Sequence, residues 1–341
     1  MTDPLDRSIH FTTQDAAGLR LDRYLTEALR QAGEAVSRTR VQDWIKLGAV
    51  KVNDALASAA QKLSERDRVE VWPQPLEASQ AFSPDPMDLR IAYLDECLLV
   101  VDKPSGCVVH PAPGHWRGTL MNGLLHWRPE LGNLPRAGIV HRLDRDTSGL
   151  LMVGLREDSH LFLQKALAER STHRIYLALV HGEAARLDGK TINLAIGRDP
   201  VSRVRMACEG IAAKNASTAV RLLSVHRLSA SSVLSLVSCK LETGRTHQIR
   251  VHLSANGFPI VGDPLYGRPA ADRCLIAADE RFSDLTALGQ ALHAGFLEIP
   301  HPHKAMPVRA FSSLPWDLGA LLPGFVAPSG DELGKLWQLN A

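Results

Sequence analysis

The sequence predicts an α+β protein, with a small α/β unit followed by a larger domain built on a mixed, mainly antiparallel sheet. Three observations predict this class. The chain has 341 residues, which is too long for one average domain. Residues 73–86 (PQPLEASQAFSPDP) are rich in Pro and Ser and poor in apolar side chains, as linkers are. Beyond them, strand-like and helix-like segments do not alternate regularly, which disfavours a parallel, doubly wound sheet.

These features divide the chain into five parts. We expect a polar leader at residues 1–17, the small unit at 18–72, a linker at 73–88, the large domain at 89–325 and a loose tail at 326–341. The boundaries follow the changes in apolar content along the chain.

Apolar residues of the small unit recur with the spacing of helices and strands. A first helix is predicted by four residues that share one helical face, Leu21, Tyr24, Leu25 and Leu29. A second helix at residues 38–47 has Ser37 as its cap and Gly48 where it ends. Alternating valines predict strands at residues 50–52 and 69–71.

The large domain contains both kinds of element. Strands are predicted at 98–102, 175–180, 218–223 and 233–241, and helices at 120–126 and 158–170.

Composition narrows the class of protein. Hydrophobic residues make up 45% of the chain and the net charge is only +2, so any charge that binds nucleic acid must be local. The five cysteines include no C-x-x-C pair, which argues against a disulfide framework or structural zinc. No apolar run has membrane-spanning length, and MTDPLDRSIHF has no signal-like segment. We therefore expect a cytoplasmic protein.

A basic cluster lies in the small unit. Four cations stand against a single acid, Asp43, and these are Arg38, Arg40, Lys46 and Lys51. Such a cluster can bind phosphates, which supply affinity without sequence specificity. A solvated helix face is the alternative from composition alone.

A charge-dense segment around Asp144 is the second candidate site. Residues 137–154 read AGIVHRLDRDTSGLLMVG, with a polar loop between two strand-like apolar runs. Catalytic groups are often displayed on such loops, because the scaffold fixes them while solvent still reaches them. The alternative is a surface turn in which Asp144 and Asp146 pair with Arg142 and Arg145.

Two known families resemble these segments. HRLDRDTSGL resembles the signature of the pseudouridine synthases of the RluA type, which modify ribosomal and transfer RNA. DKPSGCVVHPAPG and GTLMNGLL precede it, and LETGRTHQIRVHLSANGFPIVGDPLYG and QALHA follow in family order. RLDRYL followed by SRTRVQDWIKLGAVKVN resembles the S4 RNA-binding domain. The resemblance covers most of the chain and implies an S4-type unit before a synthase domain.

The signature implies a role for each polar residue of the loop. The aspartate of H-R-L-D is the catalytic residue of the family, so Asp144 takes that role. Arg142 matches the arginine that helps to flip out the target nucleotide, which is needed because the glycosidic bond is inaccessible inside a stack. Asp146 is assigned to structure.

The later motif supplies the expected partner of Asp144. Thr246 is a candidate cap for a helix ending near Asn256, which places Arg250 about one turn in. An arginine can fork onto a carboxylate and hold it ionised, and the family implies such a bridge from Arg250. Pairing with a helix neighbour is the alternative. Ile249 matches the residue lining the uracil pocket, and Arg245 is expected to contact phosphate or structure.

Tyr176 lies in a strand-like run, where most tyrosines are packing residues. The family places a tyrosine here against the target base, where stacking is favourable. We therefore include Tyr176 among the catalytic residues. Tyr176, or a water relayed to Asp144, is the candidate for removing the C5 proton of the uridine.

The implied reaction is the isomerisation of uridine to pseudouridine in structured RNA, without cofactor or metal. His301 and His303 have no H-E-x-x-H or cysteine companions, so no metal site is expected. The resemblance implies 23S ribosomal RNA, or particles containing it, as the partner. We expect a monomer with a mobile small unit, because a Pro/Ser-rich linker joins the two units. Transfer RNA or another ribosomal site remains open. So do a glycoside-hydrolase-like enzyme, which normally needs a second carboxylic acid, and a non-catalytic RNA-binding or ribosome-assembly factor.

Overall fold

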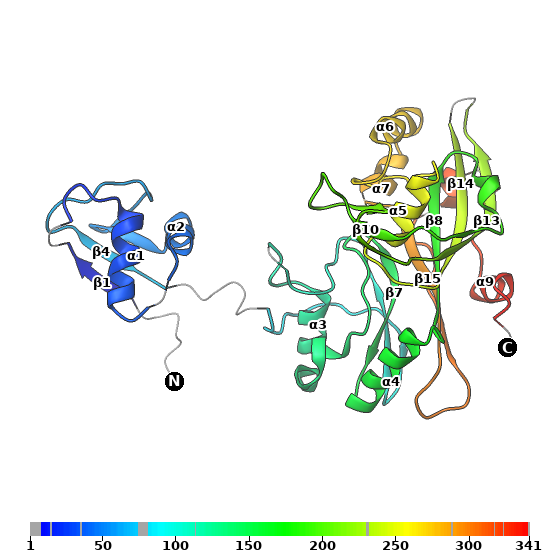
Figure 1. Cartoon of the computed structure of the whole chain (residues 1–341), viewed down its shortest axis with the longest axis horizontal. Helices are drawn as coiled ribbons and strands as arrows, with labels where there is room; N and C mark the ends of the chain where they lie inside the picture. Colours follow the sequence, from blue (N-terminus) through cyan, green and yellow to red (C-terminus); the bar gives the residue numbers. More distant parts are fainter. Residues whose placement is uncertain are drawn as a thin grey trace. The chain divides into compact units, whose positions relative to one another are not determined.

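The computed structural model describes residues 8–13, 16–34, 36–73, 81–112, 114–229, 232–287, 289–316, 318–322 and 324–339. The chain forms two compact units, Met1–Gln80 and Ala81–Ala341 (Figure 1). Each unit has its own apolar core. Within the described residues, no helix is both long and apolar enough to cross a membrane.

The first unit packs two helices against a four-stranded antiparallel sheet of order β1-β4-β2-β3. Its elements are β1 (Ile9–Thr12), α1 (Leu21–Gln31), α2 (Arg38–Lys46), β2 (Val50–Val52), β3 (Ala55–Leu56) and β4 (Arg68–Val71). Both predicted helices are confirmed, and the Ser37 side chain accepts a hydrogen bond from the Arg40 amide as a cap does. The core is formed by the apolar faces of α1 and α2 and the valines of β2 and β4.

The expected polar leader is wrong for part of its length. Ile9–Thr12 forms β1 and pairs with β4 at the edge of the sheet. Ile9 and Phe11 pack against the core on one face of the strand, while His10 and Thr12 face outward. Four residues of alternation are too few to distinguish a strand from a polar terminus by pattern alone.

The second unit is built on a long sheet of order β5-β6-β7-β15-β8-β14-β13-β9, with β16 paired to β15. Its strands are β5 (Ile91–Leu94), β6 (Leu98–Lys103), β7 (Ser148–Gly154), β8 (His173–His181), β9 (Thr191–Ile192), β13 (Thr218–Arg227), β14 (Val233–Leu241), β15 (Leu292–Ile299) and β16 (Val308–Phe311). Among the strand pairs described for this sheet, β7 with β15 is parallel and the others are antiparallel. The expected mixed, mainly antiparallel sheet is confirmed.

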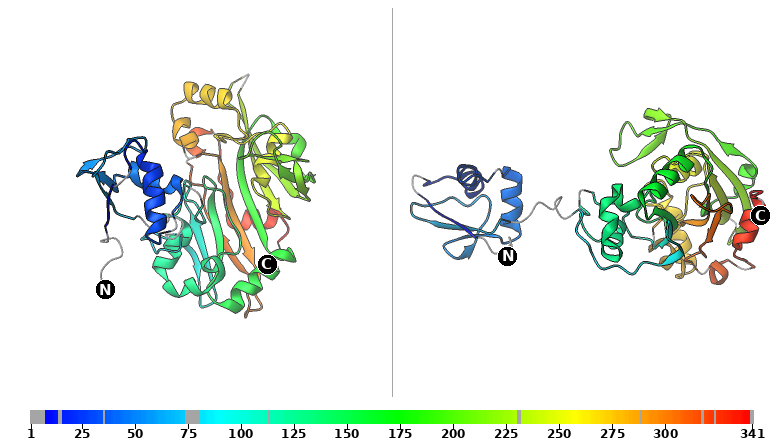
Figure 2. Two further views of the ribbon diagram at one scale, coloured as in Figure 1. Left: turned by 60° about the vertical axis from the view of Figure 1, so that its left-hand side comes forward. Right: turned by 90° about the horizontal axis from the view of Figure 1, so that it is seen from below.

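Helices and a small second sheet surround the long strands (Figures 1 and 2). The small sheet has the order β11-β10-β12, from β10 (Ile196–Arg198), β11 (Met206–Cys208) and β12 (Ile211–Lys214). The α-helices are α3 (Leu120–Trp127), α4 (Glu157–Ala168), α5 (Gln248–Ala255), α6 (Pro269–Ala278), α7 (Phe282–Ala287), α8 (Leu318–Leu321) and α9 (Gly330–Leu336). Short 3-10 helices are present at η3 (Pro129–Asn133), η4 (Pro135–Gly138) and η5 (Ala184–Leu187). In Figure 1 and in the left view of Figure 2, α6 and α4 lie at opposite ends of the strands.

The expected loose tail is also wrong. Residues 330–336 form α9, in which Leu333 is fully buried against Phe296 and Ile175 of the sheet. The indole of Trp337 donates a hydrogen bond to the Ser238 hydroxyl at 2.9 Å. The end of the chain is therefore part of the second unit.

The expected linker lies partly outside the described residues, at 74–80. Its second half packs on the second unit, because the Asn122 side chain on α3 donates to the carbonyls of Ala81 at 3.0 Å and Ser83 at 2.8 Å. Asp85 pairs with Arg117. Residues 81–88 thus belong to the second unit, which begins earlier than residue 89.

A buried lysine fixes the loop that leads into β7. Lys103 ends β6, and its ammonium donates to the carbonyls of Pro104, Cys107 and Arg145 at 2.8–2.9 Å. Burial lowers the pKa of Lys103 to about 8, so the group is still protonated at pH 7 and can donate to all three oxygens.

Replacing Lys103 with Met is expected to lower the free energy of unfolding by about 2–4 kcal/mol, because three carbonyl oxygens lose the buried ammonium that binds them. Urea unfolding of the purified variants measures this. The matched control is Lys165→Met, since Lys165 is exposed on α4, and this change is expected to shift stability by less than about 0.5 kcal/mol. Equal stability of the two variants would contradict the structural role of Lys103.

Candidate active site

Asp144 lies in the loop that precedes β7, a strand that is buried along its whole length. The Thr147 amide donates to the Asp144 carbonyl at 3.1 Å and closes a turn. Arg145 forks onto the neighbouring Asp146 at 2.9 and 3.1 Å. The local ion pair between Arg145 and Asp146 that a surface turn would contain is therefore present. Asp144 takes no part in this pair and binds a different residue.

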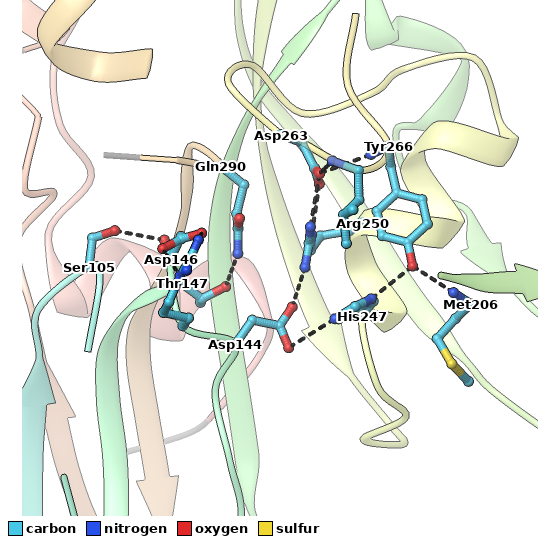
Figure 3. Close-up of polar contacts among 12 residues, drawn as sticks. Ser105, Asp144, Asp146, Thr147, Met206, His247, Arg250, Asp263, Tyr266 and Gln290 are labelled. Atoms are coloured by element: carbon cyan, nitrogen blue, oxygen red, sulfur yellow. Dashed lines mark hydrogen bonds and ion pairs between the residues drawn. The ribbon is translucent and has the colours of Figure 1, made fainter. Parts of the chain in front are cut away.

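That partner is Arg250, which stands in the first turn of α5. Its Nη1 donates to Oδ2 of Asp144 at 2.9 Å, across 106 residues of sequence (Figure 3). The Arg250 side chain is 4% exposed and that of Asp144 is 17% exposed. The contact is thus largely shielded from water, where a charge-assisted hydrogen bond is stronger than at the surface.

The bidentate fork of Arg250 goes to a different carboxylate. Nε and Nη2 of Arg250 donate to the two oxygens of Asp263 at 2.7 and 2.9 Å. Oδ1 of Asp263 also accepts from the amides of Leu265 and Tyr266. The expected contact between Arg250 and Asp144 is thus present, but the expectation that it is a two-nitrogen fork is wrong. The fork binds the more deeply buried Asp263, and Asp144 receives the one remaining guanidinium nitrogen.

Burial and pairing act in opposite directions on these groups. Burial disfavours the charge of Arg250, but its hydrogen bonds to Asp263 and its attraction to Asp263 and Asp144 outweigh this, and the pKa of Arg250 rises. Burial likewise opposes the charge of Asp263, and Arg250 overcomes it, so the pKa of Asp263 falls. Two carboxylates thus share one permanent guanidinium charge.

The expected cap of α5 is wrong. His247, with a left-handed backbone (φ 57°), occupies the N-cap position in place of Thr246, and it makes no side-chain cap bond. Its ring faces the site instead. Nε2 of His247 lies 3.9 Å from Oδ1 of Asp144, and Nδ1 lies 2.8 Å from the Tyr266 hydroxyl (Figure 3).

Sequence reasoning missed Asp263, His247 and Tyr266. Asp263 stands in the run G-D-P-L-Y-G, whose local pattern indicates only a turn. A signal did exist, because all three residues lie in the same motif segment as Arg250. A buried carboxylate near a buried arginine is a natural partner for it.

One cavity of about 460 Å³ brings the predicted site residues together. It is lined by Arg142, Asp144, Tyr176, Arg245, Ile249 and Arg250. Tyr176 comes from β8 and Ile249 from α5, and both are buried. The volume lies within the range of small-molecule sites. Loop, strand and helix thus converge on one space.

Basic side chains outnumber acidic ones in the lining of this cavity. Arg170 and Arg174 join Arg142 and Arg245 there, and Nε of Arg245 is held by the Asn215 carbonyl at 3.1 Å. Burial raises the pKa of Tyr176, so its hydroxyl stays protonated at neutral pH. Among the residues that the structure describes, no group of three or more His, Cys, Asp or Glu is placed to hold a metal ion.

The basic residues of the first unit are less free than composition suggested. Arg38 forks onto the buried Asp22 at 3.2 and 2.9 Å, and Gln42 and Arg20 bind the same carboxylate. Half of the Arg38 side chain is still exposed. Two guanidinium groups around one carboxylate leave a net positive cluster.

The other three cations lie against nearby side chains. Arg40 stacks over Trp44 at 5.1 Å and Lys51 over Trp72 at 5.3 Å, while Lys46 stands 3.6 Å from Asp43. Aromatic faces orient a cation without neutralising it.

Comparison with known proteins fits both units. Residues 97–255 match the model of the RNA pseudouridylate synthase family, and residues 19–69 match the S4 domain. A ribosomal large subunit pseudouridine synthase D from Nitrosomonas europaea is 42% identical over 318 residues, which are 93% of this chain and 88% of the relative. The chain belongs to the RNA pseudouridine synthase family. This synthase is therefore an isomerase with an S4 RNA-binding domain, as the sequence predicted.

A second relative and a solved structure support the same family. A ribosomal large subunit pseudouridine synthase D from Pseudomonas aeruginosa is 40% identical, over 94% of this chain and 96% of the relative. The solved structure of human RNA Pseudouridylate Synthase Domain Containing 1 is 29% identical, with a TM-score of 0.55, and the match covers 75% of this chain and 98% of the human one. The predicted fold of the synthase domain is confirmed.

Replacing Asp263 with Asn is expected to cost about 1–3 kcal/mol of stability near neutral pH, because Arg250 loses its charged bidentate acceptor. The pKa of Asp263 is lowered from 3.8, so its contribution is complete above about pH 4 and is lost as pH falls through the lower pKa of the folded state. Urea unfolding at pH 7 and in acid should therefore show a gap from wild type that narrows on acidification.

The matched control is Asp279→Asn, which breaks an exposed fork with Arg281. It is expected to cost well under about 1 kcal/mol. A gap for Asp263→Asn that stays constant with pH would show that charge is not what Asp263 contributes.

Proposed function

We propose that this synthase isomerises uridines of large-subunit ribosomal RNA, with Asp144 as the carboxylate that acts on the ribose. The observation that carries the assignment is the contact between Arg250 and Asp144 inside a cavity lined by cations and a buried tyrosine. Relatives named ribosomal large subunit pseudouridine synthase D support the choice of RNA. The same support favours 23S ribosomal RNA over transfer RNA.

The reaction needs only what the cavity supplies. The N1–C1′ bond of uridine breaks, the base turns, and C5 joins C1′; the C5 proton leaves and N1 gains a proton, so no oxidant or reductant is required. A carboxylate stabilises positive character at C1′ or attacks it. Arg250 restrains one oxygen of Asp144, which leaves the other oxygen for the sugar.

Tyr176 fits a stacking role better than that of a base. A general base works best with a pKa near the operating pH, and burial moves the pKa of Tyr176 further from it. Its ring lies beside apolar residues of the cavity, where a uracil would find a flat partner. We therefore assign Tyr176 and Ile249 to holding the base, and water beside Asp144 to removing the C5 proton.

Arg142 and Arg245 are assigned to the RNA around the target nucleotide. Both are exposed where they line the cavity. Arg142 is two residues from Asp144, so it would fill the stack as the flipped uridine enters. Arg245 is fixed to the Asn215 carbonyl and retains nitrogens for a phosphate.

The S4 domain supplies further RNA contacts. We assign Arg38, Arg40, Lys46 and Lys51 to phosphates, with Arg38 acting as part of the positive cluster around Asp22. Contacts of this kind give affinity that falls with salt and little choice of sequence. We place a monomer of the synthase in the cytoplasm, since one chain supplies both units and its five cysteines are free.

The change of Asp144 to Asn is expected to abolish pseudouridine formation while RNA binding survives, because the fold keeps an acceptor for Arg250 but loses the reactive carboxylate. Tritium release from RNA containing 5-tritiated uridine measures turnover, and filter binding measures affinity. The matched control is Asp146→Asn in the same loop, expected to keep turnover within roughly tenfold. Turnover by the Asp144→Asn variant would refute the assignment, and release of free uracil by the wild type would indicate a hydrolase.

Cells that lack this protein are expected to lose pseudouridines from large-subunit ribosomal RNA and to keep those of transfer RNA. Pseudouridine mapping of total RNA decides between the two targets. The comparison matters because a 43% identical relative from Bacillus subtilis is named only an uncharacterized RNA pseudouridine synthase. Loss confined to transfer RNA would overturn the proposed target and leave the chemistry intact.

A further inference from the structure

His247 lies between the candidate catalytic carboxylate and a buried tyrosine. Nδ1 is 2.8 Å from the Tyr266 hydroxyl, and Nε2 is 3.9 Å from Oδ1 of Asp144, the oxygen that Arg250 does not bind (Figure 3). The ring also meets the edge of the Tyr266 ring, with centroids 5.6 Å apart. Neither contact is needed to begin α5, because the side chain makes no cap bond.

The donors around Tyr266 and His247 indicate where the hydrogens of these two side chains lie. The Tyr266 hydroxyl accepts from the Met206 amide at 2.8 Å, and it has a single hydrogen of its own. We assign that hydrogen to the contact with Nδ1 of His247, which makes Nδ1 the acceptor. A neutral imidazole that accepts at Nδ1 carries its proton on Nε2. The N–H of His247 therefore faces Asp144.

The surroundings keep His247 neutral. Burial lowers its pKa; Asp144 and Asp263 act to raise it, and Arg250 and Arg142 act to lower it. Protonation at Nδ1 would also place a hydrogen against the Tyr266 hydroxyl, whose own hydrogen would have to turn away inside a buried site. The neutral ring with Nε2–H is the form that the contacts favour.

We propose that His247 is a positioning residue for Asp144, oriented by Tyr266 so that its Nε2–H fixes the second carboxylate oxygen. This inference rests on the proposed function of Asp144. Arg250 holds Oδ2. A hydrogen bond to one lone pair of Oδ1 stops rotation of the carboxylate about its Cβ–Cγ bond and leaves the other lone pair of Oδ1 for the sugar. The present 3.9 Å is longer than a hydrogen bond, and catalytic contacts of this kind shorten when substrate binds.

The backbone supports the same reading. His247 has φ 57°, in the left-handed region that is costly for most side chains. A residue held there points its ring at Asp144 rather than along α5. Strain of this kind persists where the surrounding contacts over-determine it, and here the Tyr266 and Met206 contacts do so.

A pair of amide variants separates positioning from folding. His247→Gln keeps an N–H about as far out as Nε2, whereas the Asn amide in His247→Asn ends near the place of Nδ1, and Asn tolerates the left-handed backbone well. We expect kcat to fall roughly tenfold to a hundredfold in His247→Asn and by less than about fivefold in His247→Gln, with the KM for RNA unchanged in both. Equal losses in the two variants, or none, would overturn the proposal.

A double-mutant cycle tests the role of Tyr266. Tyr266→Phe removes the hydroxyl that orients His247, so it should lower kcat by itself and cause no further loss in the His247→Asn background. A packing role for Tyr266 would instead give losses that multiply. If the kcat losses of the two single variants multiply in the double variant, Tyr266 does not act through His247.

The pH profile supplies a readout that a structural role would not move. In Tyr266→Phe, Nδ1 becomes free to take a proton, so the pKa of His247 rises and activity should begin to fall at a higher pH than in the wild type. His247→Gln should show no such shift. An acid limb that stays in place in Tyr266→Phe would contradict the assigned tautomer.

The Asp144→Asn variant separates a failure of the His247 role from a failure of the proposed function. If Asp144→Asn is inactive and His247→Asn is fully active, only the positioning role of His247 fails. If Asp144→Asn turns over, the proposed function fails first, whatever the His247 variants do.

Discussion

The shared guanidinium of Arg250 is the interaction on which the second unit depends. It joins the loop before β7 to α5 and to the turn after α5, through Asp144 and Asp263. Burying three charges is costly unless each has its partners. The cost is offset because Asp263 also accepts two backbone amides. The Asp144 carboxylate is consequently held in place by groups that the fold cannot easily lose.

The two carboxylates that bind Arg250 have different roles. Asp263 takes both the deeper position and the fork, so Asp144 is held by one nitrogen and stays 17% exposed towards the cavity. On the other side of the loop, Lys103 fixes the Arg145 carbonyl. Electrostatics orient the acid, and the backbone contacts keep its loop from moving away.

Much of this could be predicted from the sequence, for identifiable reasons. Spacing placed α1 and α2, and family resemblance brought Arg250 to Asp144 across 106 residues. The rest could not be predicted, because local pattern does not report burial. Asp263 looks like any turn aspartate, the left-handed His247 displaces the expected cap at Thr246, and α9 depends on a few contacts such as that of Leu333. Tertiary contacts decided each of these positions.

The place of β15 in the sheet has a consequence for how the chain reaches its folded state. β15 comes from residues 292–299 yet lies between β7 and β8, joining β5–β7 to the strands from β8 onward. A ribosome synthesises the chain from its first residue, so the two halves of the sheet cannot be joined until β15 has been synthesised near the end. Such distant pairing gives a high contact order and slow folding. A nascent chain lacking its last fifty residues therefore carries Asp144 and Arg250 without the strand that aligns them.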